Sequence, residues 1–160
     1  MTAGRARVLW LVKGLGPGGA ERLLVAAAAV HDRERFSFET DYLLPWKDAL
    51  VRPLEDLGVP TRCYGVHDER DLRWARRLRR RLLHEPVDVL HAHSPYPAGI
   101  ARLVVRTLPR ANRPRLVYTL HNTWQSFTTA TRVLNGITLP LDDADLAVSD
   151  EVRGTMWPRL

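Results

Sequence analysis

The segment from Val8 to Leu24 constrains the fold of this chain more than any other part of the sequence. A short apolar run, Val-Leu-Trp-Leu-Val, leads into a stretch with four glycines and a proline, and then into a pattern rich in alanine and leucine. This order predicts a buried strand, a tight turn and a helix. Glycines let a ligand approach the backbone, and the N–H groups of a helix N-terminus favour an anion. The turn with Gly16, Gly18 and Gly19 is therefore a candidate phosphate site.

The spacing of the glycines does not identify the phosphate. Gly14, Gly16 and Gly19 fit the pattern G-x-G-x-x-G of dinucleotide-binding proteins, which also expects an acidic residue at the end of the second strand. The second predicted strand, residues 38–44, ends in two leucines before Pro45 and has no acid at its end. A dinucleotide is therefore disfavoured. A phosphate-bearing ligand of another kind and a purely structural turn both stay open.

Length and composition indicate one domain that spans residues 1–160. This length suits a single hydrophobic core and is short for two ordinary domains. The single cysteine, Cys63, excludes an internal disulfide and fits a reducing compartment. The longest apolar stretch, from Leu23 to Val30, has eight residues and is too short to span a bilayer. The sequence therefore predicts a cytoplasmic protein.

The net charge of +6 comes from 22 arginines and two lysines against 18 acidic residues, and a basic helix is predicted from Arg70 to Arg81. Its apolar positions are Leu72, Ala75, Leu78 and Leu82, and the arginines on its other side are Arg73, Arg76, Arg77 and Arg80. That side is either simply solvated or in peripheral contact with the inner face of a membrane. The helix lacks a series of interleaved aromatic residues that would stack bases, so no nucleic-acid partner is predicted.

Strand and helix patterns alternate along the rest of the chain. Further strands are predicted at residues 61–66, 87–93, 115–121 and 146–148, and further helices at 48–57, 97–108 and within 128–139. Nearly continuous apolar strands are typical of a parallel sheet that is buried on both faces. We therefore predict an α/β fold, a Rossmann-like open parallel sheet of about six strands with helices on both faces.

Polar side chains follow three of the predicted strands. Ligands of an open parallel sheet bind outside the carboxyl ends of the strands. The sequence places His93 and Ser94 there, followed by His121 and Asn122 and finally by Ser149. These side chains are candidates to bind a sugar or a phosphorylated acceptor. Ser149 is alternatively only the N-cap of a following helix.

Two histidines on one strand raise the question of a metal site. His91 and His93 are two residues apart and therefore face the same side of their strand. No cluster of carboxylates or cysteines completes a set of ligands, so no metal is predicted. We expect His91 to lie within the sheet layer with a hydrogen bond to backbone, and His93 to end the strand.

Four segments stand in the order glycine turn, then three strand ends. They read Gly-Leu-Gly-Pro-Gly-Gly-Ala-Glu-Arg at 14–22, Asp-Val-Leu-His-Ala-His-Ser at 88–94, Tyr-Thr-Leu-His-Asn at 118–122 and Ala-Asp-Leu-Ala-Val-Ser at 144–149. In order and spacing they resemble the N-terminal domain of family 4 glycosyltransferases of the GT-B fold. The resemblance runs from about Val8 to Glu151.

The resemblance implies a function. Enzymes of this family transfer a sugar from a nucleotide-sugar to an acceptor with retention of anomeric configuration, in a cleft between two Rossmann-like domains. They usually need no metal, and no cofactor is expected here. The N-terminal domain mostly binds the acceptor. By this resemblance, Gly16, Gly18 and Gly19 face the donor diphosphate, His121 is the catalytic residue near the anomeric centre, and His93, Ser94, Asn122 and Ser149 line the acceptor side.

One part of the family pattern does not occur in the sequence. No two glutamates have the Glu-x7-Glu spacing of the nucleotide-binding C-terminal domain. We therefore expect an acceptor-side domain that is inactive alone, either because the chain is truncated or because a second chain supplies the donor-binding domain. Two other functions stay open. One is a standalone binding module for a phosphorylated small molecule or a nucleotide, and the other, disfavoured by the missing acid, is an NAD-linked enzyme.

Overall fold

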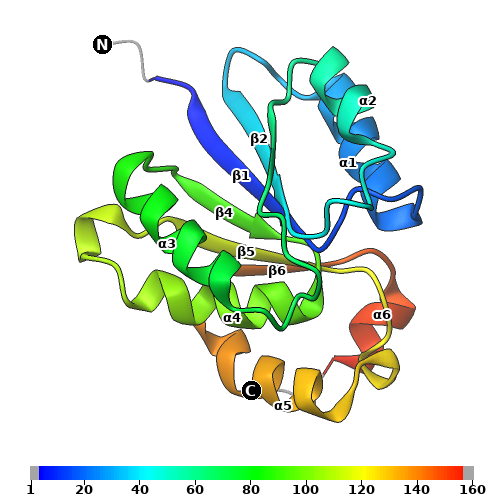
Figure 1. Ribbon diagram of the computed structural model, residues 1–160. Helices are drawn as coiled ribbons and strands as arrows, with labels where there is room; N and C mark the ends of the chain where they lie inside the picture. The colour runs from blue at the N-terminus through cyan, green and yellow to red at the C-terminus, as the bar shows by residue number, and fades with distance from the viewer. Residues whose placement is uncertain (1–3, 157–160) are drawn as a thin grey trace.

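The computed structural model describes residues 4–156, which form a single Rossmann-like α/β domain as predicted (Figure 1). Its six strands are parallel and lie in the order β3-β2-β1-β4-β5-β6. The strands are β1 (Ala6–Val12), β2 (Phe36–Tyr42), β3 (Thr61–Cys63), β4 (Val89–Ala92), β5 (Arg115–Leu120) and β6 (Ala144–Ala147). The helices are α1 (Gly19–Val30), α2 (Val51–Asp56), α3 (Arg73–His84), α4 (Pro95–Arg106), α5 (Thr129–Thr138) and α6 (Asp150–Thr155), with 3₁₀ turns η1 (Arg110–Asn112), η2 (Trp124–Ser126) and η3 (Leu139–Leu141).

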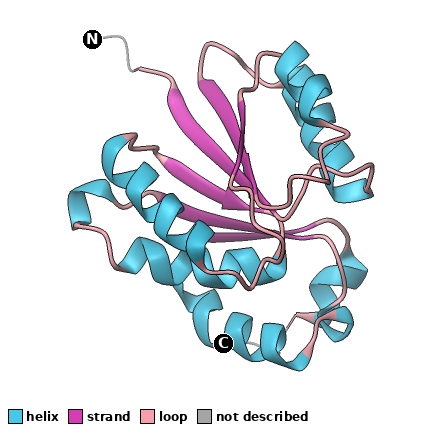
Figure 2. Cartoon of the chain, in the orientation of Figure 1, coloured by secondary structure: helices cyan, strands magenta, loops and turns pink. Residues whose placement is uncertain are grey.

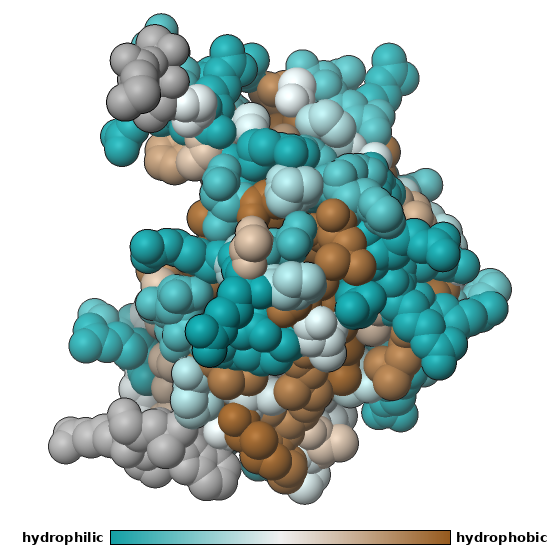
Figure 3. Space-filling view, turned by 90° about the vertical axis from the view of Figure 1, so that its left-hand side faces the viewer, coloured by the Kyte–Doolittle hydropathy of each residue, from teal (hydrophilic) through white to brown (hydrophobic). Residues whose placement is uncertain are grey.

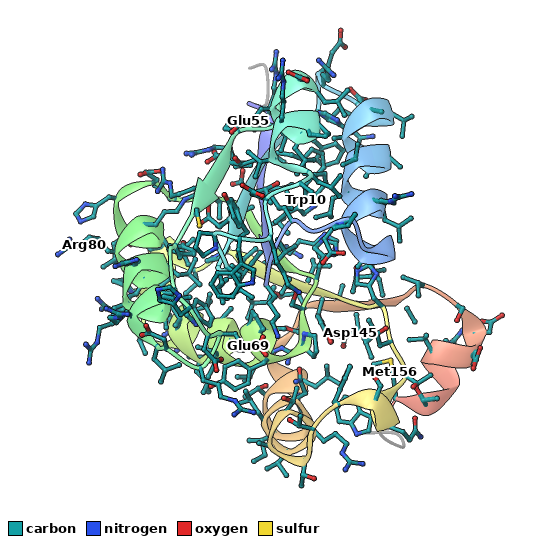
Figure 4. The ribbon with its side chains drawn as sticks, turned by 45° about the vertical axis from the view of Figure 1, so that its right-hand side comes forward. Trp10, Glu55, Glu69, Arg80, Asp145 and Met156 are labelled. Atoms are coloured by element: carbon teal, nitrogen blue, oxygen red, sulfur yellow. The ribbon has the colours of Figure 1, made fainter. Side chains whose placement is uncertain are left out.

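Alternate side chains of β1 pack against the helices on the two faces of the sheet. Leu9 and Leu11 belong to the core under α3 and α4, whereas Trp10 belongs to the core under α1 and α2. Successive side chains of a strand point to opposite faces, so one apolar strand supports both layers. Figure 2 shows the two helical layers on either side of the sheet, and Figure 4 shows Trp10 between β1 and α1.

The two edge strands of the sheet are more exposed than predicted, because the prediction had all strands buried on both faces. Within the described residues β6 pairs with β5 alone, and Leu146 of β6 is 51% exposed. At the opposite edge, β3 spans three residues instead of the six predicted, and two of these are exposed. The prediction was wrong for these two strands because an edge strand has a neighbour on one side only and lies beyond the helices that cover the centre of the sheet.

The basic helix α3 begins at Arg73 and ends at His84, a shift of about three residues from the predicted bounds. The predicted solvent-facing arginines are exposed, and Arg80 points away from the helix into solvent (Figure 4). The face of the molecule on this side is mainly hydrophilic in its upper and middle parts, with hydrophobic patches between, and hydrophobic surface is more continuous lower down (Figure 3). Contact of α3 with a membrane stays a prediction, which binding to anionic vesicles would test.

One position of this helix was predicted wrongly, and the burial of another was not predicted. Leu72 precedes the helix and is 50% exposed instead of packing on the core. Arg81 is buried, and its guanidinium pairs with Asp41 and Glu39 of β2. A buried arginine requires such partners because an unpaired charge is strongly disfavoured away from water. From Gly4 to Met156 the structure has no helix long and apolar enough to cross a bilayer.

Candidate functional site

The glycine turn and the end of β5 face the same open hollow at the carboxyl ends of the strands, about one hundred residues apart in sequence. The hollow has a volume of about 580 Å³. Its lining residues are Gly19, Ala20, Glu21 and Leu23 from the start of α1, His121 and Asn122 after β5, and Val148 after β6. The structure therefore brings together one of the predicted diphosphate-facing glycines, the predicted catalytic histidine and one of the predicted acceptor-binding residues.

The glycines of the turn differ in whether the surrounding structure requires a residue without a side chain. A Cβ atom on Gly14 would lie 2.6 Å from Cβ of Lys47, so packing requires this glycine. A Cβ atom on Gly16 or Gly19 would meet no atom within 4 Å. Neither has the positive φ that favours glycine, which the described residues show only at glycines 58 and 65. Neither packing nor conformation explains Gly16 and Gly19, and the helical glycines Gly136 and Gly154 have equally open surroundings. The open space at the turn leaves room for a ligand to approach the backbone.

The N-terminus of α1 carries opposing electrostatic features. Its N-cap is Gly18, which has no side chain to accept a hydrogen bond from the first N–H groups. These groups and the helix dipole favour an anion. The carboxylate of Glu21 lies where a Cβ atom on Gly18 would stand, and its charge opposes an approaching phosphate. An anion that binds this turn therefore requires Glu21 to swing aside or to meet a hydroxyl of the same ligand.

Three histidines gather at the ends of β4 and β5. Nδ1 of His93 lies 3.1 Å from Nε2 of His121, and the rings of His91 and His93 are in contact, tilted by 37° with centroids 4.1 Å apart. Nε2 of His91 lies 2.8 Å from the hydroxyl of Thr119, so the predicted backbone hydrogen bond of His91 was wrong. The reason is that β4 and β5 are neighbours, which places the Thr119 hydroxyl beside His91. His93 is buried behind His121 and does not line the hollow.

Burial keeps these histidines neutral near pH 7. It lowers the pKa of His91 to about 4 and, together with the neighbouring histidines, holds the pKa of His93 well below its usual value. Burial also lowers the pKa of His121, which lies partly open to the hollow. A neutral imidazole has one N–H donor and one bare nitrogen that accepts. His121 can therefore offer a ligand either a donor or an acceptor, but not a full positive charge.

Replacement of His91 by glutamine is expected to flatten the pH dependence of the free energy of unfolding between about pH 4.5 and 6. In this range the unfolded chain binds a proton on His91 that the folded protein excludes, so stability falls as the pH falls below the unfolded pKa, by about 1.4 kcal/mol per pH unit for this group. Glutamine keeps a polar atom for Thr119 but takes up no proton. Urea unfolding at several pH values measures both slopes, and equal slopes would contradict the neutral state of His91.

The hydroxyls of Ser94 and Ser149 are engaged within the fold. Oγ of Ser94 accepts a hydrogen bond from the backbone N–H of Lys13 at 2.8 Å, which ties the end of β4 to the end of β1. Oγ of Ser149 accepts from the N–H of Val152 and caps α6, which is the structural alternative predicted for it. Neither serine lines the hollow, whereas Asn122 is exposed there. A contact of either serine with an acceptor stays a prediction.

Four lining residues were not predicted as site residues: Ala20, Glu21, Leu23 and Val148. Leu23 and Val148 are 51% and 44% exposed, and with Glu21 they form part of the wall of the hollow. A sequence signal existed for Leu23, which follows Gly19 by one helical turn and therefore shares its face of α1. Val148 directly precedes Ser149 at the end of β6, where the strand-end rule already applied. In the part of the chain that the structure describes, no group of three or more histidine, cysteine or acidic side chains is arranged to hold a metal ion.

A second hollow, of about 570 Å³, lies between η2 and α5 and is mostly apolar. Its walls include Trp124, Val133 and Ile137, and the only charged side chain among its lining residues is that of Arg132. None of the residues singled out from the sequence lines it. It lacks the convergent polar groups that mark a catalytic cleft, so the hollow at the strand ends is the better candidate site.

Comparison with known proteins identifies the family to which the chain is similar. Residues 17–156 match the family model of Glycosyltransferase Family 4. The crystal structure of Anabaena Alr3699/HepE in complex with UDP and glucose is similar, with a TM-score of 0.73 and 20% identity over 94% of this chain and 40% of that chain. A putative UDP-N-acetylglucosamine 2-epimerase from Listeria monocytogenes has a TM-score of 0.66 and 14% identity over 96% of this chain and 42% of that chain.

No curated protein sequence matches this one. At such low identity the two structures show a shared fold, and this chain spans about two fifths of the length of each. The family match covers most of the 160 residues. It includes the part of the glycine turn from Pro17 onward and the segments 88–94, 118–122 and 144–149. By this match the chain belongs to glycosyltransferase family 4.

Proposed function

We propose that this domain is the acceptor-side half of a retaining glycosyltransferase that takes its sugar from a nucleotide-sugar. Membership of family 4 supports sugar transfer, and the hollow at the strand ends brings His121 and Asn122 beside the start of α1. The similar HepE structure holds UDP and glucose, which supports a nucleotide-sugar as donor. In the whole protein a second domain would bind the nucleotide and close the cleft over this hollow.

The roles of the site residues follow from their chemistry. The backbone N–H groups at the start of α1 would donate hydrogen bonds to the donor diphosphate, whose charge grows as the sugar leaves. Gly16, Gly18 and Gly19 would let the phosphate oxygens reach that backbone. His121 would contact the acceptor hydroxyl or the reacting sugar near the anomeric centre, and the amide of Asn122 would orient an acceptor hydroxyl. These steps need no metal and no cofactor.

The observation that carries this proposal is that the start of α1 and His121 line one hollow, where open space around Gly19 leaves the backbone accessible. Where the fold itself does not need a glycine, an absent side chain fits contact between the backbone and a ligand. The same open space makes a substitution informative. Gly19 lines the hollow, and a Cβ atom added there meets nothing within 4 Å, so a substitution is expected to affect the ligand more than the fold.

Replacement of Gly19 by valine is expected to abolish the binding of pyrophosphate and UDP at the turn. The branched side chain would occupy the path to the N–H groups at the start of α1. Titration of the unmodified domain, followed by backbone amide chemical shifts, should move residues 16–22 first. With half a cleft the dissociation constant is expected near about 1 mM.

Two variants control this experiment. Gly154→Val adds the same side chain to a helical glycine of α6 that also has nothing within 4 Å, and Arg80→Ala removes an exposed charge from α3. Both should bind as the unmodified domain does. If the anion changes the amide chemical shifts of α3 only and not those of the glycine turn, it is attracted by surface charge alone. The turn would then be structural.

A standalone binding module for a phosphorylated small molecule is the second candidate. The observation that favours it is that the hollow already exists within this single domain. Tight binding of a nucleotide by the domain alone, at micromolar concentration, would support the module over a half-site. An NAD-linked enzyme remains disfavoured, because the acid nearest the end of β2, Asp41, is buried and bonded to Tyr64 and Arg81 instead of being free for a ribose.

We also propose that the protein works in the cytoplasm. The support is chemical: its single cysteine, Cys63, is exposed and free, which suits a reducing compartment. Fractionation of cells that express the protein tests this location. Recovery from an oxidising compartment, such as a periplasm, would overturn it.

A further inference from the structure

We propose that His93 is a positioning residue that fixes the tautomer of His121, so that His121 presents an N–H donor and not a bare nitrogen to the hollow. The inference rests on the proposed function only for the claim that His121 contacts a ligand. The tautomer itself follows from the hydrogen bonds and burial of the residues at the ends of β4 and β5.

The first step is the contact between the two rings. Nδ1 of His93 and Nε2 of His121 are 3.1 Å apart, a hydrogen-bond distance at which one nitrogen must donate and the other accept. The backbone N–H of His93 donates to the carbonyl of Leu11 at 2.9 Å, so β1 holds the end of β4 in place. His93 is therefore fixed by the fold and has its Nδ1 directed at His121.

The second step is the direction of the proton. Nε2 of His93 is fully buried and has no hydrogen-bond partner within the described residues. Its other ring neighbours are His91, tilted with centroids 4.1 Å apart, and Trp10, at 6.4 Å and edge to face. A proton on Nε2 would leave a buried N–H without an acceptor, which proteins avoid more strictly than a buried acceptor without a donor. The proton of His93 therefore belongs on Nδ1, from which it is donated to His121.

The third step follows for His121. Its Nε2 accepts this hydrogen bond and is bare, so the proton of the neutral ring is on Nδ1. Nδ1 is not among the fully buried polar atoms and makes no hydrogen bond to residues 4–156, while the residue lines the hollow. The group that His121 offers to a ligand is therefore a neutral N–H donor. It suits an oxygen that accepts, such as a phosphate or ring oxygen, and cannot take a proton from an acceptor hydroxyl.

Nuclear magnetic resonance of the isolated domain, labelled with ¹⁵N in its histidines, reads the tautomer without any assay of sugar transfer. Long-range ¹H–¹⁵N spectra near neutral pH distinguish a protonated ring nitrogen from a bare one. In the unmodified protein Nδ1 of His121 is expected to be protonated and Nε2 bare. His93→Phe keeps a ring of similar bulk but removes the donor, so His121 should shift toward the Nε2–H tautomer that unconstrained histidine prefers.

Two further variants separate positioning from packing. His93→Asn places an amide N–H near the position of Nδ1 and should restore the tautomer found in the unmodified protein. Thr119→Val removes the partner of His91 on the same strands but leaves the His93 contact with His121, so the His121 tautomer should not change.

Three results would overturn the inference: a proton on Nε2 of His121 in the unmodified domain, an unchanged tautomer in His93→Phe, or no restoration in His93→Asn. The first measurement needs no variant, so it decides the direction of the proton even where a substitution unfolds the domain. Failure of the proposed sugar transfer would appear in the activity and binding assays and leaves these spectra unaffected.

Discussion

The purified 160-residue chain is expected to show no steady transfer of sugar from a nucleotide-sugar to an added acceptor. As the sugar leaves, negative charge develops on the diphosphate. A half-site without the hydrogen-bond donors of a second domain cannot stabilise this charge. Loss of even one such preorganised donor slows reactions by about a hundredfold to a thousandfold. Release of nucleoside diphosphate, measured over a panel of donors and acceptors, is therefore expected to be at least about a thousandfold slower than in a complete enzyme.

A contaminating enzyme is the main risk in this assay, and the Gly19→Val variant controls for it. A trace activity that is the same in both preparations comes from the host. Steady turnover that is present in the unmodified chain and absent from the variant would mean that the domain is catalytically complete, and the half-site proposal would be wrong.

Replacement of His121 by alanine, in a protein that joins this domain to a donor-binding domain, is expected to lower kcat/KM at least about a hundredfold. The imidazole lines the hollow, and a preorganised hydrogen-bond donor at the reacting atoms contributes about this much or more. The fold should survive, since the side chain is partly exposed and lies just past the end of β5. Kinetics with varied donor and varied acceptor would show which substrate the histidine serves.

His84→Ala is the matched control for this substitution. It removes a histidine that is exposed at the end of α3 and does not line the hollow. Its kinetics should equal those of the unmodified protein. If His121→Ala also leaves kcat/KM unchanged while the protein stays folded, His121 has a structural role in the His93 pair and not a catalytic one.

The fold could be predicted because most of its signals are local. An apolar run before glycines marked β1 and the start of α1, and Ser149 three residues before Val152 had the spacing of an N-cap. What the sequence did not reveal depends on residues that are distant in the chain. Nothing near Arg81 in sequence shows that it is buried, because its partner Asp41 belongs to β2, forty residues earlier.

The sequence predicted which residues follow the strands at the site, but not how their side chains contact one another. Parallel strands share a carboxyl edge, so His121 and Asn122 were expected near the glycine turn, and both line the hollow with Gly19. Which strands are neighbours is a tertiary property that the sequence does not state. The pairing of β4 with β5 sets His93 behind His121, and the pairing of β1 with β4 directs the hydroxyl of Ser94 to Lys13 and away from a ligand.

The open edge at β6 has a consequence for the handling of this domain in concentrated solution. An unprotected edge strand offers unpaired backbone groups to a strand of another copy, and like charges on that strand oppose such stacking. Asp145 supplies one of these charges (Figure 4). Burial and the neighbouring carboxyl of Asp142 raise the pKa of Asp145 to about 7, so its charge fades as the pH falls below neutral. Deprotonation of Asp145 in mildly alkaline buffer therefore adds repulsion between two β6 edges, while the net charge of +6 at pH 7 repels whole copies by a separate and more general effect.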